Sequence, residues 1–489
     1  MPKIGLEVHG YLNTKEKLFC RCKAIHGAKF TKPNTNICPI CTGQPGAKPM
    51  LPNEEAINKS IQIALILGCK INSKLIWQRK HYDWPDMPKG FQSTISGTYA
   101  IPTGEKGKFF GIKIIEAHLE EDPASWNPLT GEVDYNKSGF PLIEIVTEPN
   151  FTSNEEVIEW LKKLVMTLNY MKLIDKNLGI KVDVNISLPE IKGVRVEIKN
   201  INSLKNIKTA INYEIQRQKK PGQIPKKQET RMFDEKKSVT TKMRSKEFAE
   251  DYRFISDPDL PIINLQKNKI EKIKSSIPET PHEKVKKLIK KHKIKKKSAE
   301  VLTKKIDIAE FFENVVEKTR PKLAVQWITI ELLRVLNYVK KELDEVDIQP
   351  IHFIELLNLI ENKKITELKA KEILNKFIPK SFSPKHEMKK HSKISSEKEI
   401  EKLCEKIIKE NPSAVKDYKN GKREALNFLL GQVMKISEKE LIIRLQKKFW
   451  RKILNKIFSL LKFYKKIKIK LLNLFMFFKY LQFMSQSPH

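Results

Sequence analysis

Alternating hydrophobic and polar positions predict short strands in the first half of the chain. In IGLEVHGY, residues 4–11, apolar side chains alternate with Gly, Glu and His. Successive side chains of a strand point to opposite faces, so Glu7 and His9 share one face and the apolar side chains form the other. Further strand-like runs are KFFGIKIIEAHLEE, GFPLIEIVTEP, IKVDVNISL and GVRVEIKNI. Apolar residues recur at helical spacing in residues 53–67 and 154–171, so the pattern up to about residue 270 predicts an α+β fold.

The pattern changes at about residue 280, where Pro and Gly become rare and charge rises. Residues 322–339 and 351–359 have the spacing of amphipathic helices. A dense basic run occupies residues 284–297, and the Ser- and Lys-rich residues 380–398 are typical of a linker. The predicted domains are an α+β domain over residues 1–275, a helical domain over 276–378, a helical tail over 398–448, and a divergent basic and aromatic extension over 449–489.

Charge indicates the class of partner. The 489 residues include 93 Lys and Arg against 58 Asp and Glu, a formal net charge of +35. This excess favours a polyanionic partner. A Lys-rich composition from an A/T-rich genome would also raise the net positive charge, without any binding role. No secretory signal opens the chain, and the longest uncharged run near its end, LLNLFMFF, is too short for a bilayer span. We expect a cytoplasmic protein without a membrane-spanning segment; surface binding by a basic amphipathic helix stays open.

Four cysteines form two close pairs, Cys20 with Cys22 and Cys38 with Cys41, in the pattern C-x-C-x15-C-x-x-C. Two such pairs on two turns can meet as a tetrahedral thiolate site, which is typical of zinc. Four protein ligands leave no open position, so the predicted zinc is structural and stabilises a loop with little apolar surface of its own. Free cysteines are the alternative.

Acidic side chains interrupt several of the predicted strands. In IIEAHLEED, alternation puts Glu120 on the polar face, and Glu121 stands at the strand's end, free to turn. Glu144 follows in GFPLIEIVTEP, and VDVNISL and VRVEIKNINS add further carboxylates and amides. Each strand alone fits a solvated sheet face, but together with Glu7 and His9 they favour a site for Mg²⁺ and phosphate groups, because hard cations prefer oxygen ligands.

Basic and aromatic residues that suit nucleotide phosphates or an aminoacyl terminus lie in QRKHYDWPDMPKGFQ, which contains Lys80, Tyr82 and Lys89. The chain has no P-loop, no G-x-S-x-G motif and no Ser-x-x-x-Ser-x-x-Lys arrangement. Amide hydrolysis by this chain is therefore not indicated.

These motifs occur together in a known order. IGLEVHGYLNTKEKLFC, NTNICPICTGQPGAKP, RKHYDWPDMPKGFQ, HLEEDPASW, VDYNKSGFPLIEIVTEP, VDVNISL, VEIKNINS, ETRMFDE and DYRFISDPDLP follow one another along the chain, and KLAVQWITIELLRVLN and NPSAVKDYKNGKREALNFLLGQVMK occur in the helical part. This series closely resembles the B-subunit family of the glutamyl/aspartyl-tRNA amidotransferases. DPDLPIINL leads directly into helices, without the large inserted domain of the E-subunit paralogue, and so resembles the B form.

The resemblance implies an enzyme activity, a fold and partners. The expected fold is a large mixed α/β kinase cradle followed by all-helical middle and tail domains. The expected reaction is ATP-dependent phosphorylation of the side-chain carboxylate of Glu-tRNA(Gln) or Asp-tRNA(Asn), followed by amidation. Ammonia would come through a channel from a glutaminase A subunit, and a small C subunit would complete the heterotrimer. The misacylated tRNA is the substrate.

The resemblance also assigns site residues. The positions similar to the family's magnesium and ATP site are Glu7, His9, Glu121 and Glu144, with Glu120 close by, and those similar to its pocket lining are Lys80, Tyr82 and Lys89. The implied cofactors are ATP, Mg²⁺ and a structural Zn²⁺ on Cys20, Cys22, Cys38 and Cys41. Two rival hypotheses stay open: a noncatalytic tRNA-binding scaffold and, more distantly, a zinc-stabilised nucleic-acid-binding module of another function.

Overall fold

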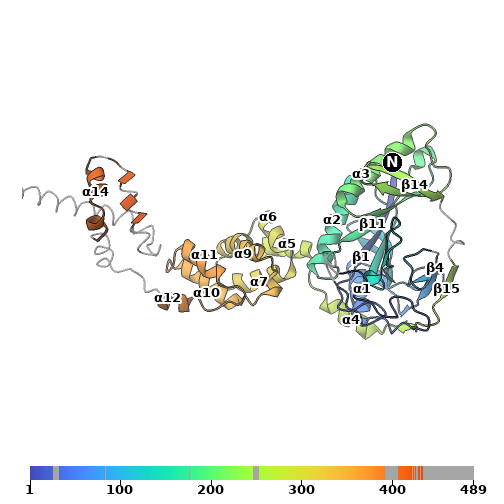
Figure 1. The fold of residues 1–489 in the computed structure, drawn as a ribbon, viewed down its shortest axis with the longest axis horizontal. Coiled ribbons are helices and arrows are strands. Elements are labelled where there is room, and N and C mark those ends of the chain that lie inside the picture. Colours follow the sequence, from blue (N-terminus) through green and yellow to red (C-terminus); the bar gives the residue numbers. More distant parts are fainter. Residues whose placement is uncertain are drawn as a thin grey trace, which may run out of the picture. The chain divides into compact units, whose positions relative to one another are not determined.

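The computed structural model describes residues 1–25, 32–82, 84–175, 177–245, 253–390 and 406–420, with residues 422, 424, 425, 428, 429, 431 and 432. These residues fall into two compact units. The first comprises Met1–Lys291 and Thr303–Ile306, and the second comprises His292–Leu302 and the chain from Asp307 onwards. The first unit contains the sheet, and the second is helical (Figure 1).

A 12-stranded mixed sheet forms the frame of the first unit, with the main strand order β14-β13-β12-β11-β1-β10-β7-β5-β4-β15. Strand β6 pairs with β7 and with β2, and β12 and β13 pair in parallel, whereas the other neighbours pair antiparallel. The strands are β1 (Lys3–Tyr11), β2 (Lys70–Ile71), β4 (Gln78–His81), β5 (Phe91–Thr94), β6 (Gly104–Phe109), β7 (Ile112–Glu121), β10 (Pro141–Thr147), β11 (Ile180–Ser187), β12 (Val196–Ile201), β13 (Glu229–Asp234), β14 (Val239–Ser245) and β15 (Arg253–Ser256).

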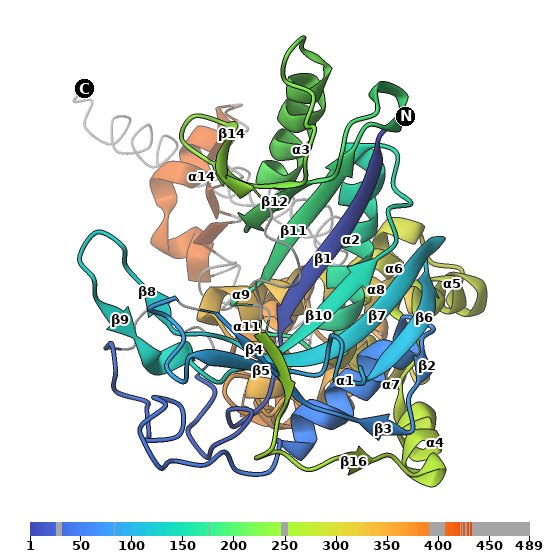
Figure 2. The same cartoon turned by 90° about the vertical axis from the view of Figure 1, so that its right-hand side faces the viewer.

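Strand β1 lies in the middle of this sheet, between β10 and β11 (Figure 2). Its residues Ile4, Leu6 and Val8 are at most 1% exposed and belong to the main core, as their alternation predicts. That core also takes buried side chains from α1 (Glu54–Ile66), α2 (Asn154–Tyr170) and α3 (Leu204–Lys219). The helices therefore cover the apolar face of the sheet, and the polar side chains of β1 are left on the other face.

Capping side chains fix where the three helices begin. Asn53, Ser153 and Ser203 each accept hydrogen bonds from backbone N–H groups of the first helical turn, which satisfies donors that have no partner within the helix. The first two helices agree with the predicted ranges 53–67 and 154–171 to within one residue at each end. The third was not predicted, although the cap at Ser203 and its buried apolar residues are the usual signals of a helix.

Smaller elements complete the first unit. Two short sheets pair β3 with β16 and β8 with β9, and two helices follow the main sheet in sequence. These elements are β3 (Lys74–Leu75), β8 (Ser125–Trp126), β9 (Val133–Asp134), β16 (Ile263–Asn264), α4 (Lys267–Ser276) and α5 (Pro281–His292), with short 3-10 helices at Tyr135–Lys137 and Pro189–Ile191.

The second unit has its own apolar interior, which includes Phe312, Trp327 and Phe353, each at most 1% exposed. The helices expected at 322–339 and 351–359 are present. The helices are α6 (Lys296–Leu302), α7 (Ile306–Val316), α8 (Pro321–Gln326), a π-helical segment (Trp327–Leu332), α9 (Leu333–Val339), a 3-10 helix (Leu343–Glu345), α10 (Pro350–Glu361), α11 (Glu367–Asn375), α12 (Lys385–Lys390) and α14 (Pro412–Lys419).

Most of the predicted tail domain, residues 398–448, and all of the predicted extension, residues 449–489, lie outside the described residues. None of the described helices has both the length and the apolar character that crossing a membrane requires.

Candidate functional site

A histidine and two glutamates meet on the polar face of the sheet. His9 on β1, Glu120 on β7 and Glu144 on β10 place ligand atoms within 4.8 Å of one another. The Nε2 atom of His9 lies 3.4 Å from Glu144 Oε2 and 3.7 Å from Glu120 Oε1. Strand register explains this meeting, because His9 is directly opposite Glu144 in the antiparallel pair of β1 and β10.

A second histidine extends this group along β7. His118 Nε2 lies 3.2 Å from Glu144 Oε2, and His118 Nδ1 lies 3.0 Å from Glu116 Oε1. Register again places the pair, since His118 is opposite Glu144 in the pairing of β10 with β7. His118 is 2% exposed. It contacts Glu144 from β7, whereas His9 contacts Glu144 from β1, on the other side of β10. His118 was not predicted as a site residue, although alternation in IIEAHLEED places it on the polar face.

The two histidines keep Glu144 ionised. Burial alone would raise the pKa of Glu144, but the charges of His9 and His118 hold it well below its usual range. Burial alone would lower the pKa of His9, but the Glu144 carboxylate raises it to about 9, and that of His118 rises to about 10 for the same reason. Burial, and then repulsion from Glu144, raise the pKa of Glu120. A divalent cation could replace the protons that this cluster holds, and these residues are suitable ligands for one.

A second acidic cluster lies on the same face, on the other side of β1. Glu7, Asp183 and Glu197 bring carboxylate oxygens within 4.8 Å of one another. The Nζ atom of Lys199 lies 3.0 Å from Asp183 Oδ2 and 3.1 Å from Glu197 Oε1, and Asn185 Nδ2 donates to Glu7 Oε1 at 2.9 Å. Glu7 therefore belongs to this cluster, beside the one that holds His9 rather than in it. We call the two clusters together the carboxylate face.

Glu121 points away from the carboxylate face. Strand β7 continues through Glu121, so alternation sends Glu120 to the polar face and Glu121 to the opposite one. Its Oε1 atom accepts hydrogen bonds from Lys89 Nζ and from the backbone N–H of Ser93, the latter at 2.8 Å. We expected Glu121 to turn and join His9 and Glu144. In the structure Glu120 lies with these two residues instead, because β7 continues through Glu121 and keeps its side chain on the opposite face.

The predicted pocket-lining residues lie on neighbouring segments. Lys80 on β4 is close enough for its charge to act on Glu120. Tyr82 follows directly after β4 and is partly buried. Lys89 pairs with Glu121 and also lies over the ring of Phe91, with Nζ 4.9 Å from the ring centroid. These residues therefore lie on or beside β4 and β5, the two strands that follow β7 in the order of the sheet.

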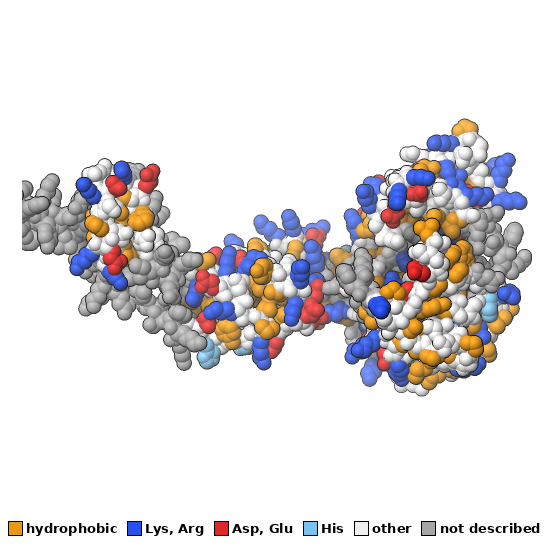
Figure 3. Space-filling view, viewed as in Figure 1, with side chains coloured by type: hydrophobic (Ala, Val, Ile, Leu, Met, Phe, Trp, Pro, Cys, Tyr) orange, Lys and Arg blue, Asp and Glu red, His pale blue; other side chains and the backbone are white. Residues whose placement is uncertain are grey.

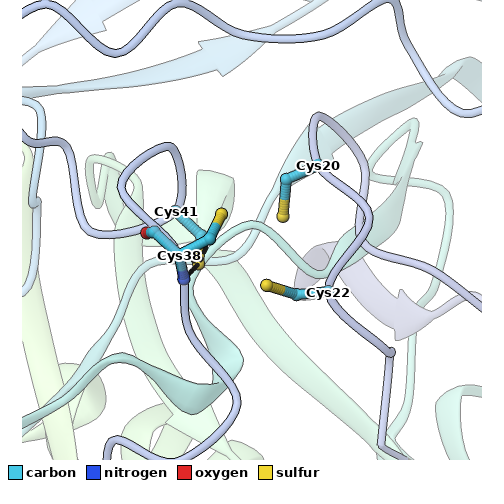
Figure 4. A group of neighbouring side chains, drawn as sticks. All are labelled: Cys20, Cys22, Cys38 and Cys41. Carbon is cyan, nitrogen blue, oxygen red and sulfur yellow. Dashed lines mark hydrogen bonds between the residues drawn. The ribbon is translucent and has the colours of Figure 1, made fainter.

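The four predicted cysteines form a single cluster, which we call the cysteine clamp. Cys20 and Cys22 come from one loop and Cys38 and Cys41 from another, with their sulfurs turned toward one another (Figure 4). All four sulfurs lie within 4.8 Å of one another, and Cys38 Sγ is 3.8 Å from Cys41 Sγ. Zn–S bonds of about 2.3 Å in tetrahedral geometry separate sulfurs by roughly 3.8 Å. The cluster thus fits a structural zinc.

A buried lysine adjoins the cysteine clamp. Lys17 Nζ lies 3.5 Å from Cys41 Sγ, and the residue is 1% exposed. The pKa of Cys41 is lowered to about 5, first by the hydrogen bond from the Cys20 thiol and further, against the effect of burial, by the Cys38 amide and the Lys17 charge. Thiolates are the form that binds zinc, so this environment prepares at least one ligand.

Comparison with known proteins agrees with the motifs. Residues 2–271 match the family model described as the GatB/GatE catalytic domain, and residues 310–441 match the one described as the GatB domain. A protein of Methanocaldococcus jannaschii, named as the B subunit of an aspartyl/glutamyl-tRNA(Asn/Gln) amidotransferase, is 44% identical over 455 residues, which cover 89% of this chain and 94% of the relative. The chain belongs to this amidotransferase B-subunit family.

Two further relatives carry the same name. The protein of Methanococcus maripaludis strain C5 is 43% identical, with 89% of this chain and 94% of the relative covered. The protein of Methanopyrus kandleri is 43% identical, with 88% and 94% covered. The carboxylate face and the cysteine clamp both lie within the match to the catalytic domain of the amidotransferase B-subunit family, which confirms the resemblance seen in the motifs.

Proposed function

We propose that this chain is the B subunit of a tRNA-dependent amidotransferase and that its first unit phosphorylates the side-chain carboxylate of Glu-tRNA(Gln), Asp-tRNA(Asn) or both. The observation that carries the proposal is the convergence of His9, Glu120 and Glu144 from three adjacent strands in a chain of this family. Perturbed ionisable groups gathered on one face of a sheet are typical of functional sites.

The residues of the site suit phosphoryl transfer. His9, Glu120 and Glu144 would hold Mg²⁺, which when bound neutralises charge on the phosphate oxygens of ATP. Lys80 and Lys89 would add positive charge and orient the nucleotide. No side-chain nucleophile is required, because the carboxylate of the aminoacyl group attacks the γ-phosphorus and ADP leaves. The product is an acyl phosphate with a good leaving group, and exclusion of water would protect it from hydrolysis.

Amidation completes the proposed reaction. Ammonia attacks the acyl carbon, inorganic phosphate leaves, and the nitrogen loses a proton to give the amide of Gln-tRNA(Gln) or Asn-tRNA(Asn). We propose that ammonia reaches this chain from a glutaminase A subunit and that a small C subunit completes the complex. The names of the relatives, which call each one the B subunit of an amidotransferase, support this division of labour.

Electrostatics favour binding of the tRNA backbone. The net charge of +35 suits contacts with phosphates. On the face drawn in Figure 3, Lys and Arg side chains are spread over both units and interspersed with acidic ones. Such a distribution fits recognition by shape and backbone charge rather than by base reading, and we expect tRNA affinity to fall steeply with salt.

Glu144→Ala tests the kinase proposal against the scaffold hypothesis. We expect this variant of the purified complex to lose amidation of both charged tRNAs by at least about 100-fold, because the cation and both histidines lose their shared carboxylate. Its tRNA affinity, measured by filter binding, should be unchanged. Glu159→Ala is the control, since Glu159 is an exposed carboxylate on α2 that pairs with Lys163. Full activity of Glu144→Ala would favour a noncatalytic scaffold.

A further inference from the structure

Both loops of the cysteine clamp contact the segment that carries Lys89. On one side, Phe19 immediately precedes Cys20, and its ring centroid lies 5.5 Å from Lys89 Nζ. On the other side, Gly43 follows Cys41 by two residues and lies directly against Pro88 and Lys89. The clamp thus touches Lys89 through an aromatic ring at one loop and through backbone at the other.

The contact at Gly43 leaves no room for a side chain. A Cβ added at Gly43 would lie 2.4 Å from the carbonyl oxygen of Pro88 and 3.0 Å from Lys89 Cγ. Gly43 has φ +64°, in the left-handed region, and its N–H donates to the carbonyl of Ile40 at 3.1 Å. Cys38 and Cys41 lie on the same turn, so the turn that carries these two cysteines also sets where the backbone of Pro88 can lie.

Phe19 is held from its other side by the core. Its ring packs edge-on against Trp77 with centroids 5.1 Å apart, and Phe19 is 3% exposed. The Lys89 ammonium therefore lies among the rings of Phe19 and Phe91 and the carboxylate of Glu121. Cation–π contacts and a charge-assisted hydrogen bond together define one position for this ammonium.

Glu121 links that position to the carboxylate face. It is the neighbour in sequence of Glu120, which lies with His9 and Glu144, and it is 5% exposed. A displaced Lys89 would leave the Glu121 carboxylate buried with one charged partner fewer, which is costly. The contacts therefore run without interruption from the cysteine clamp through Lys89 to the end of β7.

We propose that the cysteine clamp is a positioning device for Lys89 and that it acts through Gly43 on one loop and Phe19 on the other. On the turn that carries Cys38 and Cys41, the backbone of Gly43 packs against Pro88 and so directs the Lys89 ammonium toward Glu121. This role goes beyond stabilising a loop, because it makes the geometry beside the carboxylate face depend on the clamp. Its consequence for catalysis rests on the proposed function, whereas the position of Lys89 does not.

Gly43→Ala tests this proposal, with Gly46→Ala as the matched control. Gly46 also has positive φ, +81°, but an added Cβ there has no atom within 4 Å, so both variants carry backbone strain and only Gly43→Ala forces Pro88 to move. The readout is the rate at which an N-hydroxysuccinimide ester acylates Lys89 in the full-length chain, followed by mass spectrometry. A partly buried, carboxylate-paired amine reacts slowly, so we expect faster labelling of Lys89 in Gly43→Ala and the wild-type rate in Gly46→Ala.

Metal content and kinetics complete the test. Gly43→Ala should retain zinc, and kcat for amidation by the complex should fall, on the order of tenfold, because small displacements near reacting groups are costly. Equal labelling of Lys89 in the two glycine variants would overturn the proposal. Faster labelling with unchanged kcat would support the positioning role and remove Lys89 from the reaction, which separates this proposal from the proposed function.

Phe19→Leu tests the second loop of the clamp and keeps the proposal falsifiable if Gly43→Ala does not fold. The smaller side chain removes the ring beside the Lys89 ammonium, and we expect faster acylation of Lys89 there too. An unchanged labelling rate in a folded Phe19→Leu protein would contradict the proposal.

Discussion

The cysteine clamp and the carboxylate face both gather side chains that could hold a metal ion, but they are held in place in different ways. The clamp joins two loops through soft thiolate ligands, whereas the carboxylate face places its groups on strands whose register brings them together. A sheet with a large core behind it keeps that register without a metal ion. The comparison teaches that a metal ion in the clamp would serve the structure, whereas one on the carboxylate face would serve the chemistry.

The largest expected effect comes from removing a clamp ligand. Cys41→Ser should abolish tight zinc binding and lower the free energy of unfolding of the first unit by an amount on the order of 4 kcal/mol, because loops with little apolar surface lose their crosslink. Zinc content and thermal unfolding measure this. Cys69→Ala is the control, since Cys69 is a buried free cysteine outside the clamp. If the two substitutions lowered the free energy of unfolding equally, the clamp would contribute no more to stability than an ordinary buried cysteine.

The next effect concerns the two neighbouring glutamates of β7. Glu120→Gln should reduce amidation by about 100-fold or more, because Glu120 shares a cluster with His9 and Glu144. Glu121→Gln should reduce it less, through the weakened hold on Lys89. Neither substitution should change the unfolding temperature as much as Cys41→Ser does. If Glu121→Gln lost more activity than Glu120→Gln, the site residue would be Glu121, as the resemblance implies, and not Glu120, as the geometry indicates.

The smallest effect is on the pH dependence of stability at the outer strands. Burial alone would raise the pKa of Glu214, but hydrogen bonds from Arg217 and Gln218 hold it below its usual range. A lowered pKa in the folded state stabilises the fold above the unfolded pKa, near 4.5, and this stability is lost as pH falls through the folded value. Replacing Glu214 with Gln should cost about 2 kcal/mol at pH 7 and less at pH 3.

Unfolding of the full-length protein at the two pH values, by denaturant titration, measures this difference. Glu214 is fully buried and also accepts a hydrogen bond from Thr240 of β14 at 2.8 Å. We therefore expect Glu214→Gln to loosen the structure first where α3 meets the outer strands. A stability difference between wild type and Glu214→Gln that is independent of pH would contradict the expected role of this carboxylate.

Local patterns in the sequence predicted much of the fold and one of the two clusters. Alternation assigned Glu7 and His9 to the polar face of β1, and helical spacing located α1 and α2. The spacing of the four cysteines predicted that they meet, because pairs on two tight turns can do so whatever the rest of the fold is. Each of these inferences depends on residues that are near one another in the sequence.

The carboxylate face could not be assembled in the same way. Whether Glu7 lies with His9 or with Asp183 depends on β11 pairing with the other edge of β1, and no local pattern reveals strand order. The choice between Glu120 and Glu121 depends on how far β7 continues, and strand ends are set by long-range pairing. Helix α3 differs from these cases, because its N-cap at Ser203 is a local signal that the sequence itself contains.

The central place of β1 has a consequence for how the molecule is made. Both of its partners, β10 and β11, are more than a hundred residues further along the chain. During synthesis, β1 leaves the ribosome long before Ile180–Ser187 exists, so one backbone edge of β1 has no strand to pair with until then. Such distant pairing slows folding, so a nascent chain halted before β11 would present the unpaired backbone edge of β1 to chaperones.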